Sequence, residues 1–182
     1  LIPVRLTREE EEKYYRGFAN EVVWPLFHDL QSHCNFDPAY WDTYQNVNRK
    51  FAEVVAQHTG PEDFVWIHDY HLLLAATELR AMGVKSKLGY FLHIPFPPLD
   101  IFVKMPWRLE LLLALLQYDI IGFQTMRDRR NFLQCLRALV GAADLCGRGQ
   151  VCDIELEHDK LRLGAFPISI DYKWFASRAG SK

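Results

Sequence analysis

Residues 64–80 read FVWIHDYHLLLAATELR, and this stretch decides the fold. Its first four residues are apolar and lead into the polar cluster His68-Asp69-Tyr70-His71. A segment rich in leucine and alanine, with helical character, follows. A short apolar run that turns into a helix is typical of a buried strand in an alternating strand–helix fold. Two histidines, an aspartate and a tyrosine at that turn indicate an edge that faces a ligand.

The same pattern recurs along the chain. Short apolar runs that predict strands lie at residues 63–69, 87–94, 118–124 and 161–169. Helical segments are predicted between them, at residues 71–82, 98–106, 107–117 and 125–141, with Thr125 as the N-cap of the last one. Strands and helices that alternate at this spacing form βαβ units, so we predict an α/β fold: a Rossmann-like parallel sheet flanked by helices. Because the runs are apolar throughout, we expect helices on both faces of the sheet.

The N-terminal third predicts a strand and two helices. Residues 1–6 have strand character, and Thr7 then begins a helix with a capping box. Tyr14, Tyr15 and Trp24 lie on this amphipathic helix, where aromatic rings ordinarily belong to the core. A second helix is predicted over residues 38–59, with an aspartate before its first proline. Residues 141–160 are weakly patterned and predict a loop and a short strand.

Composition indicates one globular domain over residues 1–182. The net charge of −2 argues against a nucleic-acid partner. The longest apolar run, residues 111–116, is too short to span a membrane. Four cysteines without a CxxC motif favour a reducing cytoplasm over a disulfide framework. The chain begins at Leu1 rather than at methionine, and we interpret it as a piece of a longer protein.

Polar residues stand at the end of each predicted strand. The first strand ends at His68-Asp69-Tyr70-His71 and the second at His93. The third and fourth strands end at Gln124, Thr125, Ser169 and Asp171. Ligands of open parallel sheets bind at the carboxyl ends of the strands, so we expect these side chains to share one rim.

Each rim residue also has a structural interpretation. Asp69 is well placed to cap the helix that follows it, and His93 alone is compatible with a structural histidine. His68 and His71 have an HxxH spacing, but no third ligand is evident, so we predict no metal site. A phosphate loop, a GxSxG motif and a GxGxxG motif are all absent from the sequence.

Seven motifs, taken together, resemble one family. They are YYRGFANEVVWPLFH, NRKFAE, VWIHDYHLL, GYFLHIPFP, DIIGFQT, RNFLQC and AFPISID. In this order and spacing the chain resembles the trehalose-6-phosphate synthases, the retaining glycosyltransferases of family 20. The resemblance implies the N-terminal, acceptor-binding half of a GT-B fold, with the first strand and the donor domain absent. It also implies transfer of glucose from UDP-glucose to glucose 6-phosphate with retention, without a metal or another cofactor.

The resemblance assigns roles to six residues. Tyr15 and Trp24 match the aromatic pair that contacts the acceptor and its phosphate. Asp69 matches the carboxylate that holds acceptor hydroxyls, and Tyr70 and His71 line the same wall. His93 matches the histidine that contacts the glucose of the donor. Carboxylate, imidazole and ring faces suit a sugar, and positioning would supply most of the catalysis.

Some family features are missing. The resemblance places a glycine-rich loop and a phosphate-binding arginine before Leu1, and the arginine and lysine that hold UDP after Lys182. Ser169 stands where the family usually has glycine. Two alternatives therefore remain open, a glucosylglycerol-phosphate synthase with another acceptor and a non-catalytic sugar-phosphate-binding or regulatory domain. We expect the isolated chain to be inactive, and a homo-oligomer is one alternative for its assembly.

Overall fold

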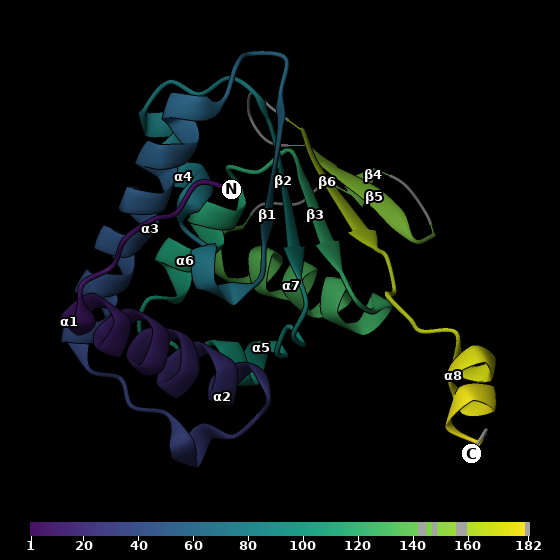
Figure 1. Ribbon diagram of the computed structural model, residues 1–182. Coiled ribbons are helices and arrows are strands. Elements are labelled where there is room, and N and C mark those ends of the chain that lie inside the picture. The colour runs from purple at the N-terminus through teal and green to yellow at the C-terminus, as the bar shows by residue number, and fades with distance from the viewer. Residues whose placement is uncertain (142–144, 147–148, 156–159, 181–182) are drawn as a thin grey trace.

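The computed structural model describes residues 1–141, 145–146, 149–155 and 160–180 (Figure 1). Six strands form one sheet in the order β1-β2-β3-β6-β5-β4. Their bounds are β1 (Phe64–His68), β2 (Lys87–Leu92), β3 (Ile120–Phe123), β4 (Leu145–Cys146), β5 (Val151–Glu155) and β6 (Lys160–Ala165). Each predicted strand after residue 60 therefore exists, with ends within a few residues of those expected.

The sheet is parallel over four of its strands. β1, β2, β3 and β6 run parallel to one another, whereas β5 is antiparallel to β6 and β4 is antiparallel to β5. The predicted Rossmann-like α/β fold is confirmed, with an antiparallel extension at one edge. The weakly patterned region supplies that extension through β4 and β5. Parts of it, residues 142–144, 147–148 and 156–159, lie outside the described residues.

Helices connect the strands and precede them. They are α1 (Arg8–Glu10), η1 (Glu11–Val23), α2 (Trp24–Phe27), η2 (Gln31–His33), α3 (Pro38–His58), η3 (Tyr70–Leu72), α4 (Ala75–Ala81), α5 (Leu99–Phe102), α6 (Arg108–Leu115), α7 (Met126–Leu139) and α8 (Tyr172–Ala179). The predicted caps are confirmed. Thr7 and Glu10 form a capping box, Asp37 accepts a hydrogen bond from the Ala39 N–H, and Thr125 caps α7.

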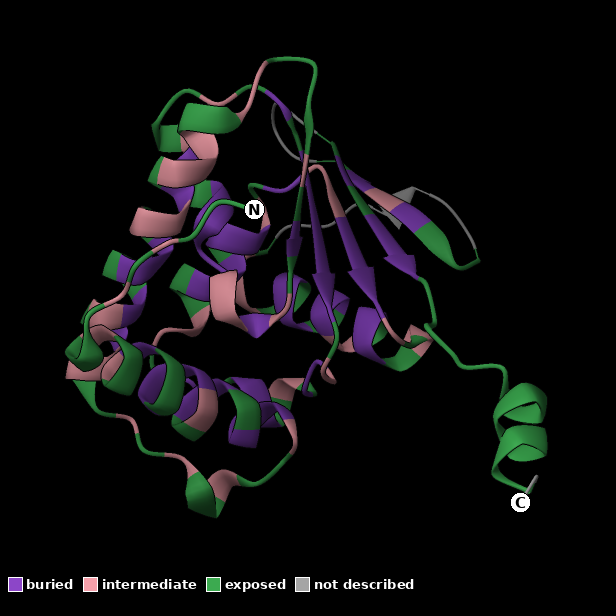
Figure 2. Ribbon diagram, viewed as in Figure 1, coloured by how far each residue is buried: buried purple, intermediate pink, exposed green. Residues whose placement is uncertain are grey.

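The prediction that both faces of the sheet are covered is wrong for the described residues. In β1, Ile67 is 6% exposed on one face, whereas Trp66 is 60% exposed on the other. Figure 2 shows the central strands mainly buried, whereas α8 is exposed along its length. On this second face, rings lie across glycines of the sheet: a Cβ added to Gly89 would lie 2.5 Å from Phe64, and one added to Gly122 would lie 2.6 Å from Phe91. An apolar pattern shows that a face avoids water, but it does not show what covers that face.

Residues 1–6 form no strand, so that prediction is also wrong. They lead into the Thr7 cap without regular secondary structure, and among the described residues they pair with no strand of the sheet. The sequence has strand character here, but a strand exists only where a partner supplies the ladder of hydrogen bonds.

The η1 segment is a π-helix rather than an α-helix. Its end is marked by the Trp24 N–H, which bonds to the Ala19 carbonyl five residues earlier. Its buried residues are Tyr14, Gly17, Phe18, Ala19, Val22 and Val23. Gly17 lets this helix approach α3, because a Cβ there would lie 2.8 Å from the Tyr40 ring. π-helices are rare and are frequently found at functional sites.

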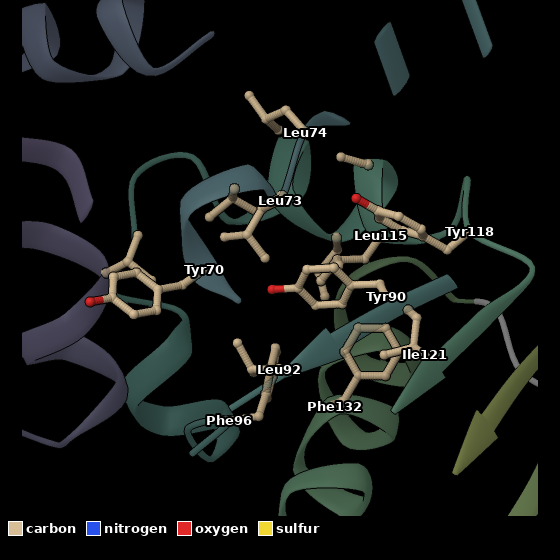
Figure 3. Packing of buried hydrophobic residues seen from close by; sticks show 14 of the residues in the cluster. Tyr70, Leu73, Leu74, Tyr90, Leu92, Phe96, Leu115, Tyr118, Ile121 and Phe132 are labelled. Carbon is tan, nitrogen blue, oxygen red and sulfur yellow. The ribbon is translucent and has the colours of Figure 1, made fainter. Parts of the chain in front are cut away.

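Large apolar side chains fill the space between the sheet and its helices. Figure 3 shows Tyr70, Leu73, Leu92 and Phe96 near one another in the buried cluster, where Leu92 is the last residue of β2 and Tyr70 follows β1 by two residues. The residues that follow these two strands therefore rest on a rigid core. The described thiols, those of Cys34, Cys135 and Cys152, are free.

Candidate active site

Asp69 occupies a strained position directly after β1. Its backbone has φ 66° and ψ 172°, a region that is essentially restricted to glycine. The Asp69 N–H donates to the Phe91 carbonyl at 2.8 Å, and its Oδ1 accepts from the His93 N–H at 3.4 Å. These contacts hold the carboxylate at the point where β1 and β2 end. The side chain makes no cap bond to η3, so the interpretation of Asp69 as a helix cap is wrong.

His68 and His93 are neighbours on adjacent strand ends. Nδ1 of His68 lies 3.0 Å from Nε2 of His93, with the two rings nearly parallel. His71, the other member of the HxxH spacing, has different neighbours, because its ring stacks on Tyr15. The two histidines of that motif therefore do not converge. Among the described residues, no three His, Cys, Asp or Glu side chains form a group that could hold a metal ion.

Three rings form a wall beside Asp69. Tyr15 stacks on His71 with centroids 5.4 Å apart, and Tyr70 lies 4.2 Å from His71. The Tyr70 hydroxyl donates to Oδ1 of Asn20 at 3.0 Å. Burial, with the Asp69 charge and Tyr15 adding to it, raises the pKa of Tyr70 to about 12. Tyr70 is therefore a neutral hydrogen-bond donor at neutral pH.

Burial also sets the charge state of His71. It lowers the pKa of the imidazole below the ordinary value of 6.5, while the neighbouring Asp69 charge opposes this change. A neutral imidazole offers one donor and one acceptor nitrogen. The wall beside the carboxylate is thus formed by neutral, hydrogen-bonding rings.

The π-helix brings Tyr15 and Trp24 to the same side. Nine residues separate them, which is two and a half turns of an α-helix at about 3.6 residues per turn, and that would place them on opposite faces. Closure over five residues winds roughly 4.4 residues per turn, so nine residues make about two turns. Both rings are exposed, Tyr15 by 48% and Trp24 by 39%, whereas Tyr14 is buried. The interpretation as core rings is right for Tyr14 and wrong for the other two.

The predicted site and rim residues fall into two groups. Tyr15, Asp69, Tyr70, His71 and His93 come together through the contacts above. Trp24 begins α2, directly after the π-helix, and its ring stacks on His28 with centroids 4.2 Å apart.

The other rim residues have structural partners. Gln124 accepts from the Ile168 N–H at 2.9 Å, Thr125 caps α7, and Asp171 caps α8. Ser169 bonds weakly to the Ile170 carbonyl at 3.4 Å. These side chains shape the edge of the sheet rather than the wall.

Two features were not predicted. Asn20 links the π-helix to Tyr70, and its only sequence signal is a lone amide inside an apolar helix. The loop after His93 is clamped by α7, where Asp128 accepts from the Phe96 N–H at 3.2 Å and Asn131 donates to the Phe96 carbonyl at 2.8 Å. This clamp fixes the loop that carries His93.

The profile of glycosyltransferase family 20 matches residues 1–182. The chain belongs to glycosyltransferase family 20. It is 42% identical over 175 residues to a trehalose-6-phosphate synthase of Mycolicibacterium smegmatis and 41% identical to one of Mycolicibacterium gilvum. Each match covers 94% of this chain but 35% of the relative. The chain therefore spans about a third of the length of these curated relatives.

Solved structures agree with the family membership. An α,α-trehalose-phosphate synthase (UDP-forming) from Burkholderia xenovorans, in complex with glucose-6-phosphate, has a TM-score of 0.89 at 34% identity. A trehalose-6-phosphate protein from E. coli, bound with UDP-2-fluoro glucose, has a TM-score of 0.85 at 38% identity. Each match covers 97% of this chain. It covers 40% of the B. xenovorans chain and 38% of the E. coli chain. The expected relation to these synthases is confirmed.

Within the part of the chain that the structure describes, no helix has the length and apolar character needed to cross a membrane.

Proposed function

We propose that this chain is the acceptor-binding part of a UDP-forming α,α-trehalose-phosphate synthase. The complete protein would transfer glucose from UDP-glucose to glucose 6-phosphate with retention. One observation carries the proposal: the Asp69 carboxylate is fixed between the ends of β1 and β2, beside a wall of Tyr15, Tyr70 and His71. The B. xenovorans relative was solved with glucose-6-phosphate, which supports the choice of acceptor.

The acceptor sugar would lie against the aromatic wall. Carboxylate oxygens accept hydrogen bonds from sugar hydroxyls, and charge-assisted bonds of this kind are short and strong. Asp69 would hold the acceptor hydroxyls, while Tyr70 and His71 line the same side. Tyr15 of the π-helix and Trp24, the first residue of α2, are both exposed and would contact the ring and its phosphate.

His93 would serve the donor rather than the acceptor. It lies at the end of β2, with its ring exposed and close to His68. The E. coli relative was solved with UDP-2-fluoro glucose, a donor-like ligand. In our proposal His93 contacts the glucose of the donor, and residues outside this chain hold the UDP.

Catalysis would come mainly from positioning. The carboxylate and imidazole hold two substrates in a fixed geometry, which can lower a barrier by several kcal/mol, about 7–11 in favourable cases. The leaving phosphate would accept the proton of the attacking hydroxyl, so no protein nucleophile is needed. The proposal includes no metal and no cofactor, and it places the protein in the cytoplasm.

A product assay on the full-length protein tests this proposal. UDP-glucose is supplied with glucose 6-phosphate, or with glycerol 3-phosphate in a parallel reaction, and the product is identified by NMR. We expect trehalose 6-phosphate with both anomeric centres in the α configuration. Transfer to glycerol 3-phosphate instead would favour the glucosylglycerol-phosphate alternative, and binding without transfer would favour a regulatory domain. The isolated 182-residue chain should transfer no glucose.

A further inference from the structure

Asn20 joins the two segments that carry the aromatic wall. Its Nδ2 donates to the Tyr15 carbonyl at 2.9 Å, and its Oδ1 accepts from the Tyr70 hydroxyl at 3.0 Å. Tyr70 lies against His71, and His71 stacks on Tyr15. The four residues therefore form a closed ring of contacts between η1 and η3.

The chemistry of asparagine suits this position. An amide offers a donor and an acceptor on one rigid plane, so it can bond to a carbonyl and to a hydroxyl at once. Tyr70 is 7% exposed, and its hydroxyl would lose its partner if the amide were removed. A buried hydroxyl without a partner carries a desolvation penalty, so the ring would shift to find another partner.

The hydrogen bond from Asn20 to the Tyr15 carbonyl links two positions within the π-helix η1. The amide reaches a carbonyl five residues earlier, which is the same spacing that defines a π-helix. That winding places Tyr15, Asn20 and Trp24 along one ridge, at intervals of five and four residues. Loss of the amide would weaken the link between this ridge and the loop of Asp69.

We propose that Asn20 is a positioning residue for the acceptor: it locks Tyr15 and Tyr70 into the geometry that binds the sugar phosphate. This inference rests on the proposed function, because it assumes that the wall holds the acceptor. Asn20 acts through its neighbours, so its loss should weaken acceptor binding and leave donor use unchanged.

The experiment measures glucose 6-phosphate affinity by calorimetry, and UDP-glucose kinetics, in the full-length protein. Asn20→Ala should weaken glucose 6-phosphate binding about tenfold, since one buried hydrogen bond corresponds to roughly that factor. The KM for UDP-glucose should stay within about twofold. Arg16→Gln is the matched control, because Arg16 is exposed on the same helix and its ion pairs within the described residues are with Glu11 and Glu12.

Tyr70→Phe gives a second, milder variant that removes only the hydroxyl. It should weaken glucose 6-phosphate binding to a similar extent. The double variant Asn20→Ala/Tyr70→Phe should bind glucose 6-phosphate no more weakly than the single variant with the lower affinity. This pair keeps the test decisive even if Asn20→Ala does not fold.

Three results would overturn the proposals in different ways. Wild-type affinity in both Asn20→Ala and Tyr70→Phe would overturn the role of Asn20 alone. A wild-type protein that binds glucose 6-phosphate but does not transfer glucose would overturn the proposed function alone. A wild-type protein that does not bind glucose 6-phosphate would overturn both.

Discussion

At the scale of the residue, Asp69 combines the carboxylate that we propose to hold the acceptor with an unfavourable backbone conformation. Its φ of 66° and ψ of 172° cost roughly 1–3 kcal/mol in a residue other than glycine. The neighbouring strands impose this geometry through the bonds to Phe91 and His93. A strained residue that is held in place at the end of a strand is consistent with a site selected for function rather than for stability.

Two substitutions at this position separate stability from function. Asp69→Gly relieves the backbone strain and Asp69→Ala keeps it, while both remove the carboxylate. We expect Asp69→Gly to exceed Asp69→Ala by about 1 kcal/mol or more in free energy of unfolding, measured in urea. Both should lose at least about tenfold in kcat/KM for the acceptor. Equal stability of the two variants would contradict the role of strain.

His71 should make stability depend on pH. Burial lowers its pKa below the ordinary value of 6.5, so the unfolded chain binds this proton at a higher pH than the folded chain does. The stability that neutral His71 contributes is complete above that value and is lost as the pH falls through the folded pKa. Urea unfolding at about pH 7.5 and about pH 5.5 should show a smaller acid loss in His71→Gln than in the wild type. An equal loss would contradict this.

Two buried tyrosines provide a test of hydrogen-bond satisfaction. Among the described residues, the Tyr90 hydroxyl has no partner, and Figure 3 shows it pointing toward the side where Tyr70 lies. The Tyr44 hydroxyl instead donates to the Tyr70 carbonyl at 2.7 Å and accepts from the Leu73 N–H at 3.0 Å.

Opposite effects on stability are expected when each tyrosine is changed to phenylalanine. Tyr90→Phe should raise the free energy of unfolding by about 1 kcal/mol, and Tyr44→Phe should lower it by about 1–3 kcal/mol. Thermal and urea unfolding would measure both. A loss of stability in Tyr90→Phe comparable to that in Tyr44→Phe would show that the Tyr90 hydroxyl is satisfied.

The sequence located Asp69 and His93 because strand ends can be read from apolar runs. It could not show the backbone angles of Asp69, because the same dipeptides occur in many conformations. It also could not show that Asn20 contacts Tyr70, fifty residues away, because one sequence carries no record of which distant residues meet. Residue patterns alone put Tyr15 and Trp24 in the core, and only the family resemblance placed them at the site.

At the scale of the element, the winding of η1 matters most. The sequence predicted a helix after Thr7, and its cap was right, but the repeat of its apolar residues was assumed to be that of an α-helix. The Trp24 N–H bonds to the carbonyl five residues earlier, so the segment winds more widely than an α-helix. The winding decides whether the exposed rings of Tyr15 and Trp24 lie on one face. A helix predicted at the right place but with the wrong winding therefore predicts the wrong set of exposed side chains.

Gly17 tests the contact between this helix and α3. Alanine normally favours helix by about 1 kcal/mol over glycine, yet a Cβ here would lie 2.8 Å from the Tyr40 ring. Gly17→Ala should therefore lower the free energy of unfolding by about 1–3 kcal/mol through overpacking. Gly60→Ala is the control, because its Cβ would meet Asp63 at an ordinary 3.5 Å, and it should change stability by about 0.5 kcal/mol or less. Similar effects in both variants would contradict close packing at Gly17.

At the scale of the whole molecule, strand order and helix placement follow from alternation along the chain. The exposure of one face of the sheet could not be predicted in this way. Phe64 and Trp66 are exposed, although their apolar side chains are typical of a fully buried strand. Local patterns report how apolar a face is, while coverage depends on which segments fold against it. This is why the fold class was predicted correctly and the number of covered faces was not.

One measurement tests the acceptor site most directly: steady-state kinetics of the full-length protein with Asp69→Asn and His93→Ala, varying each substrate in turn. Asp69→Asn should lower kcat/KM for glucose 6-phosphate at least about tenfold, since a bond to a charged group contributes roughly 1.5–3 kcal/mol. His93→Ala should lower kcat or raise the KM for UDP-glucose, with the KM for glucose 6-phosphate within about twofold of the wild type. Unchanged use of glucose 6-phosphate in Asp69→Asn, or identical defects in both variants, would contradict an acceptor site built on Asp69.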